Sequence, residues 1–324
     1  MRLGIVGNGG IVHAALNTLQ NSEIEVAALW CRSAGKGKVI TEKYAIKKLY
    51  TDYDAFLQDD RFDTVYIGLI NSLHYAYAKK AILAGKNVIV EKPFTITSNE
   101  ARELTLLASE KSVYLFEAIM SRYSQNYEAI RSVLQSIGDI KLIQCNYSQY
   151  SSRYDAYKAG TVLPAFDPRY AGGALYDINV YNVHFVEGLF GKPVEVKYFA
   201  NKGFNGIDTS GIAILQYDSF QAVCCGAKDS ASKSGITIQG TDGCIVMDSR
   251  PGVIKNITLY KNDGMEERID TCIEENPMLQ EFNKINTMIT ENDYEQMQTW
   301  ALDSVRVVEI LEKARRDANI IFSE

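Results

Sequence analysis

The chain of 324 residues has little cysteine and little proline, with 6 of each. The cysteines are Cys31, Cys145, Cys224, Cys225, Cys244 and Cys272. They show no CxxC spacing, which argues against a zinc site or a disulfide framework and is typical of reduced thiols that pack in a core. With 46% hydrophobic residues and no biased tract, the composition excludes a disordered or fibrous protein. We therefore expect a globular protein without a metal site.

Long apolar runs and an excess of positive charge are also missing. No apolar stretch reaches the ~18 residues of a membrane span, and the formal net charge is -6 at pH 7. Nucleic acids and anionic membranes attract clustered positive charge, so neither is an expected partner. The first residues, from Arg2 to Val6, read as a strand rather than as a signal peptide. These features predict a cytoplasmic protein with a small-molecule partner.

Between Arg2 and Glu117, short apolar strands alternate with amphipathic helices, which is the pattern of a parallel sheet built from βαβ units. The expected strands are Leu3 to Val6, Ile24 to Trp30, Thr64 to Leu69, Asn87 to Val90 and Val113 to Phe116. Thr97 and Glu100 have the spacing of a capping box at the start of a further helix. We predict a Rossmann domain, with a doubly wound parallel sheet, over residues 1–118.

The pattern changes after Glu117. The expected elements are a helix near Tyr127 to Gln135, strands near Lys141 to Tyr150, Val194 to Ala200, Gly211 to Tyr217, Gln221 to Cys225, Ser234 to Gln239 and Cys244 to Met247, and a last helix over Gln296 to Asn319. Strands separated by short turns predict a mostly antiparallel sheet. The predicted fold class is thus α/β with a second, α+β domain over residues 119–324, whose last helix is free to pack back on the first domain.

A glycine-rich turn joins the first expected strand to the first helix. It reads Gly7, Asn8, Gly9, Gly10 and Ile11. In a dinucleotide-binding turn, Gly7 permits the tight bend, Gly9 lets the main chain approach a pyrophosphate, and the helix N-terminus supplies amide groups. Val12 stands where Gly or Ala usually packs the helix on the strand, which predicts a looser fit. The turn predicts NAD(P) binding, and a purely structural turn is the alternative.

The end of the second expected strand carries no carboxylate. An NAD-binding Asp or Glu would stand there, about 20 residues beyond the glycines, to hold the ribose 2′-hydroxyl. Arg32 and Ser33, with Lys36 nearby, occupy this region instead. A guanidinium and a hydroxyl suit a 2′-phosphate because they form charge-assisted hydrogen bonds with it. We predict that NADP is preferred over NAD, and a solvated basic loop is the alternative.

Lys92 directly follows the strand that ends near Val90. Ligands of open α/β sheets bind beyond the carboxyl ends of the strands, so Lys92 is expected near the cofactor. Pro93 restricts the backbone of Lys92 to extended conformations. A lysine amine beside a nicotinamide can donate a hydrogen bond, and desolvation can lower its pKa for acid/base work. Lys92 is therefore a candidate catalytic residue, with a solvated strand-end lysine as the alternative.

A second polar cluster follows Gly172 and Gly173. At ~100° per helical residue, Asp177, Tyr181 and His184 fall on one narrow face, and apolar residues gather on the opposite face. This pattern predicts a helix that buries one side and exposes a titratable stripe on the other. A carboxylate, a phenol and an imidazole together can orient a polyol and relay its proton. The alternatives are a capping role for Asp177 and a core position for Tyr181.

Together these motifs resemble the Gfo/Idh/MocA family of oxidoreductases, with the closest motifs in its dihydrodiol-dehydrogenase-like and xylose-dehydrogenase-like members. The resemblance extends over essentially the whole chain. It rests on the Gly7-x-Gly9 turn, Asn71 and His74, Glu91-Lys92-Pro93, Glu117 to Arg122, and Gly172-Gly173 leading to Asp177 and Tyr181. The Glu-Lys-Pro tripeptide is the most specific of these signals.

The resemblance implies roles on the cofactor side. Asn71, His74 and Glu91 are implied to lie with the dinucleotide, and Lys92 is implied to lie near the nicotinamide. One departure from the family pattern is Ile70, which replaces the proline usually found before Asn71.

The resemblance also implies roles on the substrate side. Asp177 is implied to bind substrate hydroxyls, and Tyr181 is implied to exchange the hydroxyl proton with support from Lys92. His184 stands where many members have Asp, which leaves the substrate open. Asp177 and His184 would position adjoining hydroxyls. The loop residues expected to line the substrate are Tyr154, Tyr157, Phe166 and Arg169.

The function expected is hydride transfer between NADP or NAD and a secondary alcohol or carbonyl of a sugar, cyclitol or vicinal diol. An NAD-dependent glycosidase on the same scaffold and a non-catalytic dinucleotide-sensing regulator are the alternatives. Because an open antiparallel sheet needs its outer face covered, a homodimer or homotetramer formed through the second domain is expected.

Overall fold

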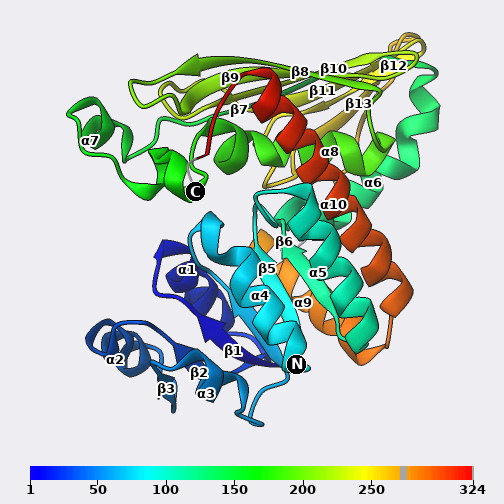
Figure 1. Cartoon of the computed structure of the whole chain (residues 1–324). Coiled ribbons are helices and arrows are strands. Elements are labelled where there is room, and N and C mark those ends of the chain that lie inside the picture. Colours follow the sequence, from blue (N-terminus) through cyan, green and yellow to red (C-terminus); the bar gives the residue numbers. More distant parts are fainter. Residues whose placement is uncertain (271–275, 323–324) are drawn as a thin grey trace. The chain divides into compact units, whose positions relative to one another are not determined.

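The computed structural model describes residues 1–270 and 276–322, and their contacts divide the chain into two compact units. One unit comprises Met1–Ala118 and Met278–Val305, and the other comprises Ile119–Pro277 and Arg306–Glu324 (Figure 1). Cys272, one of the expected core cysteines, lies outside the described residues.

The first unit is built on a six-stranded parallel sheet with the strand order β3-β2-β1-β4-β5-β6. The strands are β1 (Arg2–Val6), β2 (Glu25–Trp30), β3 (Leu49–Tyr50), β4 (Thr64–Ile67), β5 (Asn87–Glu91) and β6 (Leu115–Ala118). Strands β1, β4 and β5 are almost wholly buried because helices cover both faces of such a sheet. The order is that of a doubly wound Rossmann sheet, which confirms the predicted fold class, and ligands of such sheets bind beyond the carboxyl ends of the strands.

Helices cover this sheet. They are α1 (Gly10–Leu19), α2 (Ala34–Lys43), α3 (Tyr53–Leu57), α4 (His74–Leu83), α5 (Ser98–Lys111), α9 (Pro277–Thr290) and residues 294–305 of α10 (Tyr294–Asp317). The predicted capping box begins α5: Thr97 Oγ1 accepts from Glu100 N at 3.3 Å, and Glu100 Oε2 accepts from Thr97 N at 3.0 Å. Helix α9, which the sequence analysis did not predict, packs on the sheet through Phe282, whose ring centroid lies 5.5 Å from that of Tyr66.

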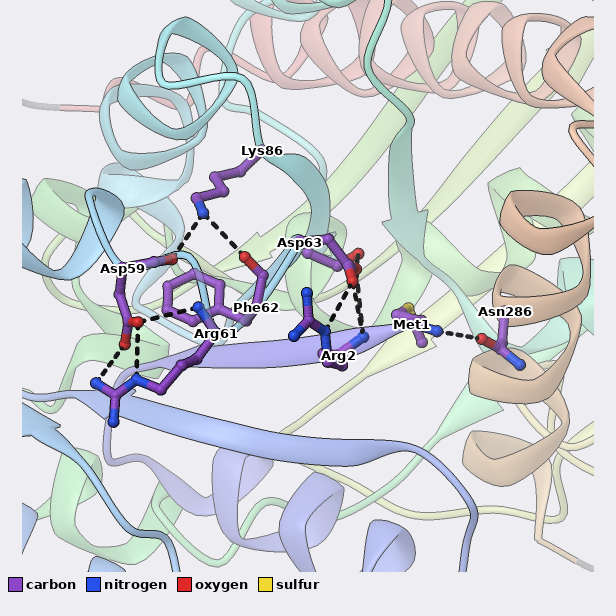
Figure 2. A network of polar contacts seen from close by, with 9 residues as sticks. Met1, Arg2, Asp59, Arg61, Phe62, Asp63, Lys86 and Asn286 are labelled. Atoms are coloured by element: carbon purple, nitrogen blue, oxygen red, sulfur yellow. Dashed lines mark hydrogen bonds and ion pairs between the residues drawn. The ribbon is translucent and has the colours of Figure 1, made fainter.

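A polar network ties the start of β1 to its neighbours in the same unit (Figure 2). The Met1 ammonium donates to Asn286 Oδ1 on α9 at 2.9 Å, and Arg2 N donates to Asp63 Oδ1 at 3.2 Å. Lys86 is buried, and its Nζ donates to the carbonyl oxygens of Asp59 at 2.8 Å and of Phe62 at 2.9 Å. These contacts fix the amino end of the sheet, opposite the end where the glycine turn lies.

The second unit contains an eight-stranded sheet with the order β14-β13-β12-β11-β7-β10-β9-β8. The strands are β7 (Ile140–Ser148), β8 (Glu195–Lys202), β9 (Asp208–Gln216), β10 (Gln221–Ala227), β11 (Gly235–Gly240), β12 (Gly243–Met247), β13 (Ile257–Lys261) and β14 (Glu266–Arg268). Strands β7 and β10 pair in parallel, and the other pairs are antiparallel. The predicted, mostly antiparallel sheet is therefore confirmed.

One face of this sheet carries α8 (Val180–Phe190), which packs on β7 and β10 (Figure 1). The unit also contains α6 (Gln125–Val133) and the short α7 (Tyr154–Lys158). On β10 the neighbours Cys224 and Cys225 point to opposite faces, with Cys224 fully buried and Cys225 half-buried. The outward face keeps exposed apolar side chains, among them Phe199 on β8 and Ile212 on β9.

Candidate active site

The turn after β1 has the geometry of a pyrophosphate cradle. Gly7 has a φ of +118°, and a Cβ atom there would lie 2.4 Å from the carbonyl oxygen of Gly68, so both backbone and space require glycine. A Cβ on Gly9 or Gly10 would meet only open space, and no side chain caps the start of α1. The first-turn amides of α1, beside exposed Asn8 and half-buried Ile11, therefore suit an anionic ligand.

Val12 does not loosen this turn as the sequence predicted. It is fully buried, and a Cβ on Gly68 would lie 2.7 Å from Val12 Cγ2. The glycine that usually lets helix and strand approach is thus supplied by the residue after β4. This close fit corrects the expectation of a looser contact.

The loop after β2 carries the residues expected to select the dinucleotide. Arg32 and Ser33 are both exposed, and Ser33 Oγ caps α2 by accepting from Lys36 N at 3.4 Å. The hydroxyl hydrogen of Ser33 and the guanidinium of Arg32 remain donors at the carboxyl end of β2. Their chemistry fits a phosphate.

Lys92 lies half-buried just beyond β5, and the Lys92–Pro93 peptide bond is cis. The preceding Glu91 is buried, and its carboxylate accepts from the Tyr66 hydroxyl at 2.6 Å and from Lys92 N at 3.2 Å. Burial raises the pKa of Glu91 to about 7, although the Tyr66 hydrogen bond and the Lys92 charge oppose the rise. Glu91 therefore supports the backbone of Lys92 from inside the sheet.

Two further buried carboxyl groups belong to this region. Glu117 on β6 accepts from Phe94 N at 2.9 Å. Glu281 on α9 is 1% exposed, and burial raises its pKa well above the usual range, with the charges of Glu91 and Glu117 adding to the rise. The acidic residue on α9 was missed by the sequence analysis, because a single Glu on an amphipathic helix reads as a surface residue.

His74 is buried rather than open to a ligand. Its Nδ1 lies 2.8 Å from the carbonyl oxygen of Pro93 and its Nε2 lies 3.2 Å from that of Leu69. Burial lowers the pKa of His74, although the hydrogen bonds to these two carbonyl oxygens favour the protonated ring and oppose the fall. The ring thus joins the segments that follow β4 and β5, while Asn71 lies half-buried in a 3₁₀ turn after β4.

In the second unit, the paired glycines open the helix that carries the substrate-side candidates. Gly173 has a φ of +101°, and a Cβ there would lie 2.1 Å from Asp208 Oδ1. The buried Asp208 accepts from Leu175 N at 2.6 Å, so a carboxylate from β9 caps the first turn of the helix. The alternative that Asp177 caps this helix is not needed, because Asp208 fills that role.

The helix does not expose a titratable stripe, which corrects the sequence prediction. It starts with a π-helical turn over Leu175–Asn179 before α8, so the assumed rotation of ~100° per residue fails between Asp177 and Tyr181. Tyr181 is 9% exposed and His184 is 6% exposed. Tyr181 packs against the ring of Tyr147 on β7, with ring centroids 5.6 Å apart.

Asp177 is half-buried, and its Oδ2 lies 2.7 Å from the Nζ atom of Lys228, which follows β10. The same Nζ donates to the carbonyl oxygen of Ala165 at 2.6 Å. The sequence analysis did not identify Lys228. Its only sequence signal is a lysine placed directly after an apolar strand.

The loop expected to line the substrate forms an aromatic cluster. Phe166 is fully buried and stacks on Tyr157, with ring centroids 5.0 Å apart, while Tyr154 is half-buried 5.7 Å away. Arg169 is bound by Asp167 through its Nε and Nη2 atoms, at 3.1 and 2.6 Å. Phe166 and Tyr157 therefore act through packing, and Tyr154 is the more accessible of these rings.

Within residues 1–270 and 276–322, no group of three or more His, Cys, Asp or Glu side chains is arranged to hold a metal ion. Along the same part of the chain, no helix is both long and apolar enough to cross a membrane.

Comparisons with known proteins show the family and the fold. A family model described as an oxidoreductase family with an NAD-binding Rossmann fold matches residues 1–119, and one described as a GFO/IDH/MocA C-terminal domain matches residues 127–246. The scyllo-inositol 2-dehydrogenase (NADP(+)) IolU of Bacillus subtilis (strain 168) is 33% identical, over 99% of this chain and 98% of that protein.

A second curated relative and a solved structure are also similar to this chain. The trans-1,2-dihydrobenzene-1,2-diol dehydrogenase of Xenopus tropicalis is 31% identical, over 85% of this chain and 81% of that protein. The crystal structure of KijD10, a 3-ketoreductase from Actinomadura kijaniata, in complex with NADP and TDP-benzene, shares the fold with a TM-score of 0.84 at 21% identity, covering 98% of this chain and 97% of that one. The chain therefore belongs to the Gfo/Idh/MocA family of oxidoreductases and carries an NAD(P)-binding Rossmann fold in its first unit.

Proposed function

We propose that this oxidoreductase transfers a hydride between NADP and a secondary alcohol, or the corresponding carbonyl, of a sugar, cyclitol or vicinal diol. The observation that carries the proposal lies within the first unit. Strands β1 and β5 are parallel members of one sheet, so the uncapped glycine turn after β1 and Lys92 after β5 emerge at the same edge. A dinucleotide on the turn and an amine beyond β5 are the parts that such chemistry needs.

The residues proposed to hold the dinucleotide lie at this edge of the sheet. The turn from Gly7 to Ile11 would bind the pyrophosphate, Arg32 and Ser33 would bind the 2′-phosphate, and Asn71 would lie beside the nucleotide. Glu91 and His74 would act from inside, by fixing the backbone around Lys92. The NADP(+) in the name of the B. subtilis relative supports the preference for NADP.

When bound, the nicotinamide supplies the carbon that accepts or gives the hydride. We assign the proton of the reacting hydroxyl to Tyr181, because a phenol can serve as donor and acceptor in one position. Lys92 would support that exchange as a hydrogen-bond donor. Asp177 would accept hydrogen bonds from neighbouring hydroxyls and orient the substrate, with His184 and Arg169 supplying further polar contacts.

The substrate class rests on the relatives. One is named for an inositol and another for a dihydrobenzene diol, and both names describe rings with adjacent hydroxyl groups. Tyr154, beside the buried Phe166, supplies an aromatic surface suited to the apolar face of such a ring.

The two domains predicted from the sequence would divide this work. Residues 1–118 would bind the dinucleotide, and residues 119–324 would bind the substrate and form a homodimer or homotetramer. The exposed outer face of the eight-stranded sheet supports the oligomer, because Phe199 and Ile212 are cross-strand neighbours on it. A cytoplasmic location without nucleic-acid or membrane partners remains part of the proposal.

A substrate panel tests the function. Aldoses, cyclitols and vicinal diols are incubated with each oxidised dinucleotide, and the corresponding ketones with each reduced one, while absorbance of the reduced nicotinamide is followed. The proposal expects turnover of at least one polyol, with a KM for NADP at least about tenfold below that for NAD. Comparable KM values would overturn the NADP preference. Cleavage of a nitrophenyl glycoside without net redox change, or tight NADP binding without any turnover, would overturn the proposed reaction.

A further inference from the structure

The carboxylate of Asp177 is held by a lysine that lies far from it in the sequence. Lys228 Nζ and Asp177 Oδ2 are 2.7 Å apart, with side-chain exposures of 2% for Lys228 and 33% for Asp177. The pair thus joins a buried cation to a carboxylate that solvent or a ligand can reach. An ammonium removed from water in this way is stable only if its charge and its N–H groups are satisfied.

The surroundings of Lys228 fix its amine in one place. Its backbone N donates to the carbonyl oxygen of Thr209 at 2.9 Å, and its own carbonyl accepts from Ser151 N at 2.8 Å. The amine donates to the carbonyl oxygen of Ala165 at 2.6 Å and lies 4.4 Å from the centroid of the Phe166 ring. Because Ala165 O also accepts from Gly173 N at 3.0 Å, the amine links the aromatic loop to the start of the helix that carries Asp177.

Three aspartates on the elements around this pair have partners of their own. Asp208 on β9 accepts from Leu175 N and from the Tyr198 hydroxyl, and burial raises its pKa. Asp229 accepts from the hydroxyls of Thr209 and Ser210 at 2.7 and 2.8 Å. Asp167 binds Arg169. The ammonium of Lys228 is in direct contact with the carboxylate of Asp177.

We propose that Lys228 is a positioning residue that keeps Asp177 ionised and oriented toward the substrate hydroxyls. This inference rests on the substrate-binding role proposed for Asp177. A nearby cation favours the charged form of a carboxyl group, and an ionised carboxylate only accepts hydrogen bonds, which matches a polyol that donates them. Without the amine, partial burial would favour the protonated acid, and the side chain would lose a contact that helps to set its orientation.

Kinetics of Lys228→Met and Lys228→Arg test the inference. In Lys228→Met we expect kcat/KM to fall about 100-fold, with most of the loss in KM for the polyol, because a small displacement of a binding group has effects of this size. In the pH profile of kcat/KM, the acidic limb should lie at higher pH in Lys228→Met than in the wild type. In Lys228→Arg it should lie close to the wild-type position. The affinity for NADPH should stay unchanged, because Lys228 belongs to the second unit.

A double-mutant cycle separates positioning from simple destabilisation. Lys228→Met alone leaves a partly buried carboxylate without its cation, whereas Lys228→Met combined with Asp177→Asn removes both charges and is the better candidate to fold. In the Asp177→Asn background, Lys228→Met should change kcat/KM by less than about twofold. An equal loss in both backgrounds would overturn the inference.

Lys197→Met is the matched control, because Lys197 is half-exposed and its pair with Asp317 lies at 3.4 Å on the surface of the same unit. This variant should keep wild-type kinetics and pH dependence. A wild-type enzyme that turns over no polyol would overturn the proposed function itself. An active wild type whose KM and acidic limb are unchanged by Lys228→Met would overturn only the role of Lys228.

Discussion

Lys92 stands between a buried glutamate and a buried proline, and the backbone N of Lys92 donates to the glutamate carboxylate. We expect Lys92→Met to lower kcat by about 100-fold to 10,000-fold, the usual range for general acid–base catalysis, because the proposed proton exchange would lose its supporting hydrogen-bond donor. NADPH affinity, measured by fluorescence of the bound nicotinamide, should be retained. Lys80→Met is the control, because Lys80 pairs with Asp54 at the surface of the same unit. Wild-type turnover in Lys92→Met with normal NADPH binding would rule out the proposed role of Lys92.

The buried carboxyl groups near Lys92 make the first unit sensitive to pH. Folding raises the pKa of Glu91 from 4.5 to about 7, and burial also raises the pKa of Glu281. Because the folded state holds these protons more tightly, the stability they contribute is full below about pH 4.5 and is lost as the pH rises through the folded pKa values.

Glu281→Gln tests this linkage. The amide cannot ionise, so the fall in melting temperature between pH 5 and pH 8 should become shallower than in the wild type. Thermal unfolding followed by circular dichroism across this range measures the slope. Glu295→Gln, at the start of α10, is a control that should keep the wild-type slope. The same slope in Glu281→Gln and the wild type would mean that Glu281 is not held protonated by the fold.

At the scale of elements, the start of α5 depends on one reciprocal pair of contacts. Thr97→Ala removes the side chain that accepts from Glu100 N and should cost about 1 kcal/mol. A melting temperature about 2 to 4 °C lower is the expected result for a unit of this size. Thr97→Ser keeps the hydroxyl and should stay close to the wild type. If Thr97→Ala melted at the same temperature as Thr97→Ser and the wild type, the cap would contribute nothing to stability.

Most elements of the first unit were predictable because their local signals agree, but strand β3 and helix α9 were not predicted. Strands β1, β4 and β5 are apolar runs, Gly7 marks the turn, and Thr97 with Glu100 marks a helix start. Strand β14 gave no such signal, because its three residues are charged or polar and exposed at the sheet edge. Helix α9 was missed although its Met278, Phe282 and Ile285 are buried at helical spacing.

The sequence places each candidate site residue on an element, but it does not predict the surroundings of these residues. Sequence spacing placed Asp177, Tyr181 and His184 on one helix, yet a single π-helical turn altered their relative rotation. Neither the buried state of Tyr181 nor the contact between Lys228 and Asp177 follows from spacing. The burial of Tyr181 and the contact of Asp177 are tertiary features. They depend on β7 and on the residue after β10, which are distant from the helix in the sequence.

At the scale of the whole molecule, the outer face of the eight-stranded sheet is the proposed interface between copies. Phe199 is 64% exposed and Ile212 is 43% exposed, and the two residues face each other across β8 and β9. Placing a charge there by Phe199→Asp should weaken self-association at least about tenfold. Light scattering over a concentration series measures the change. Leu106→Asp, at a residue that is 62% exposed on α5, is the control. An unchanged mass in Phe199→Asp would exclude this face.

The central claim, that the protein moves a hydride directly between a dinucleotide and a substrate carbon, is tested most directly by isotope transfer. A ketone from the panel is reduced with NADPH in which both hydrogens on C4 of the nicotinamide are replaced by deuterium. The product is analysed by mass spectrometry and NMR. The account predicts one deuterium for each NADPH oxidised, bound to the carbon that becomes the secondary alcohol. Oxidation of NADPH that leaves this carbon without deuterium would contradict it.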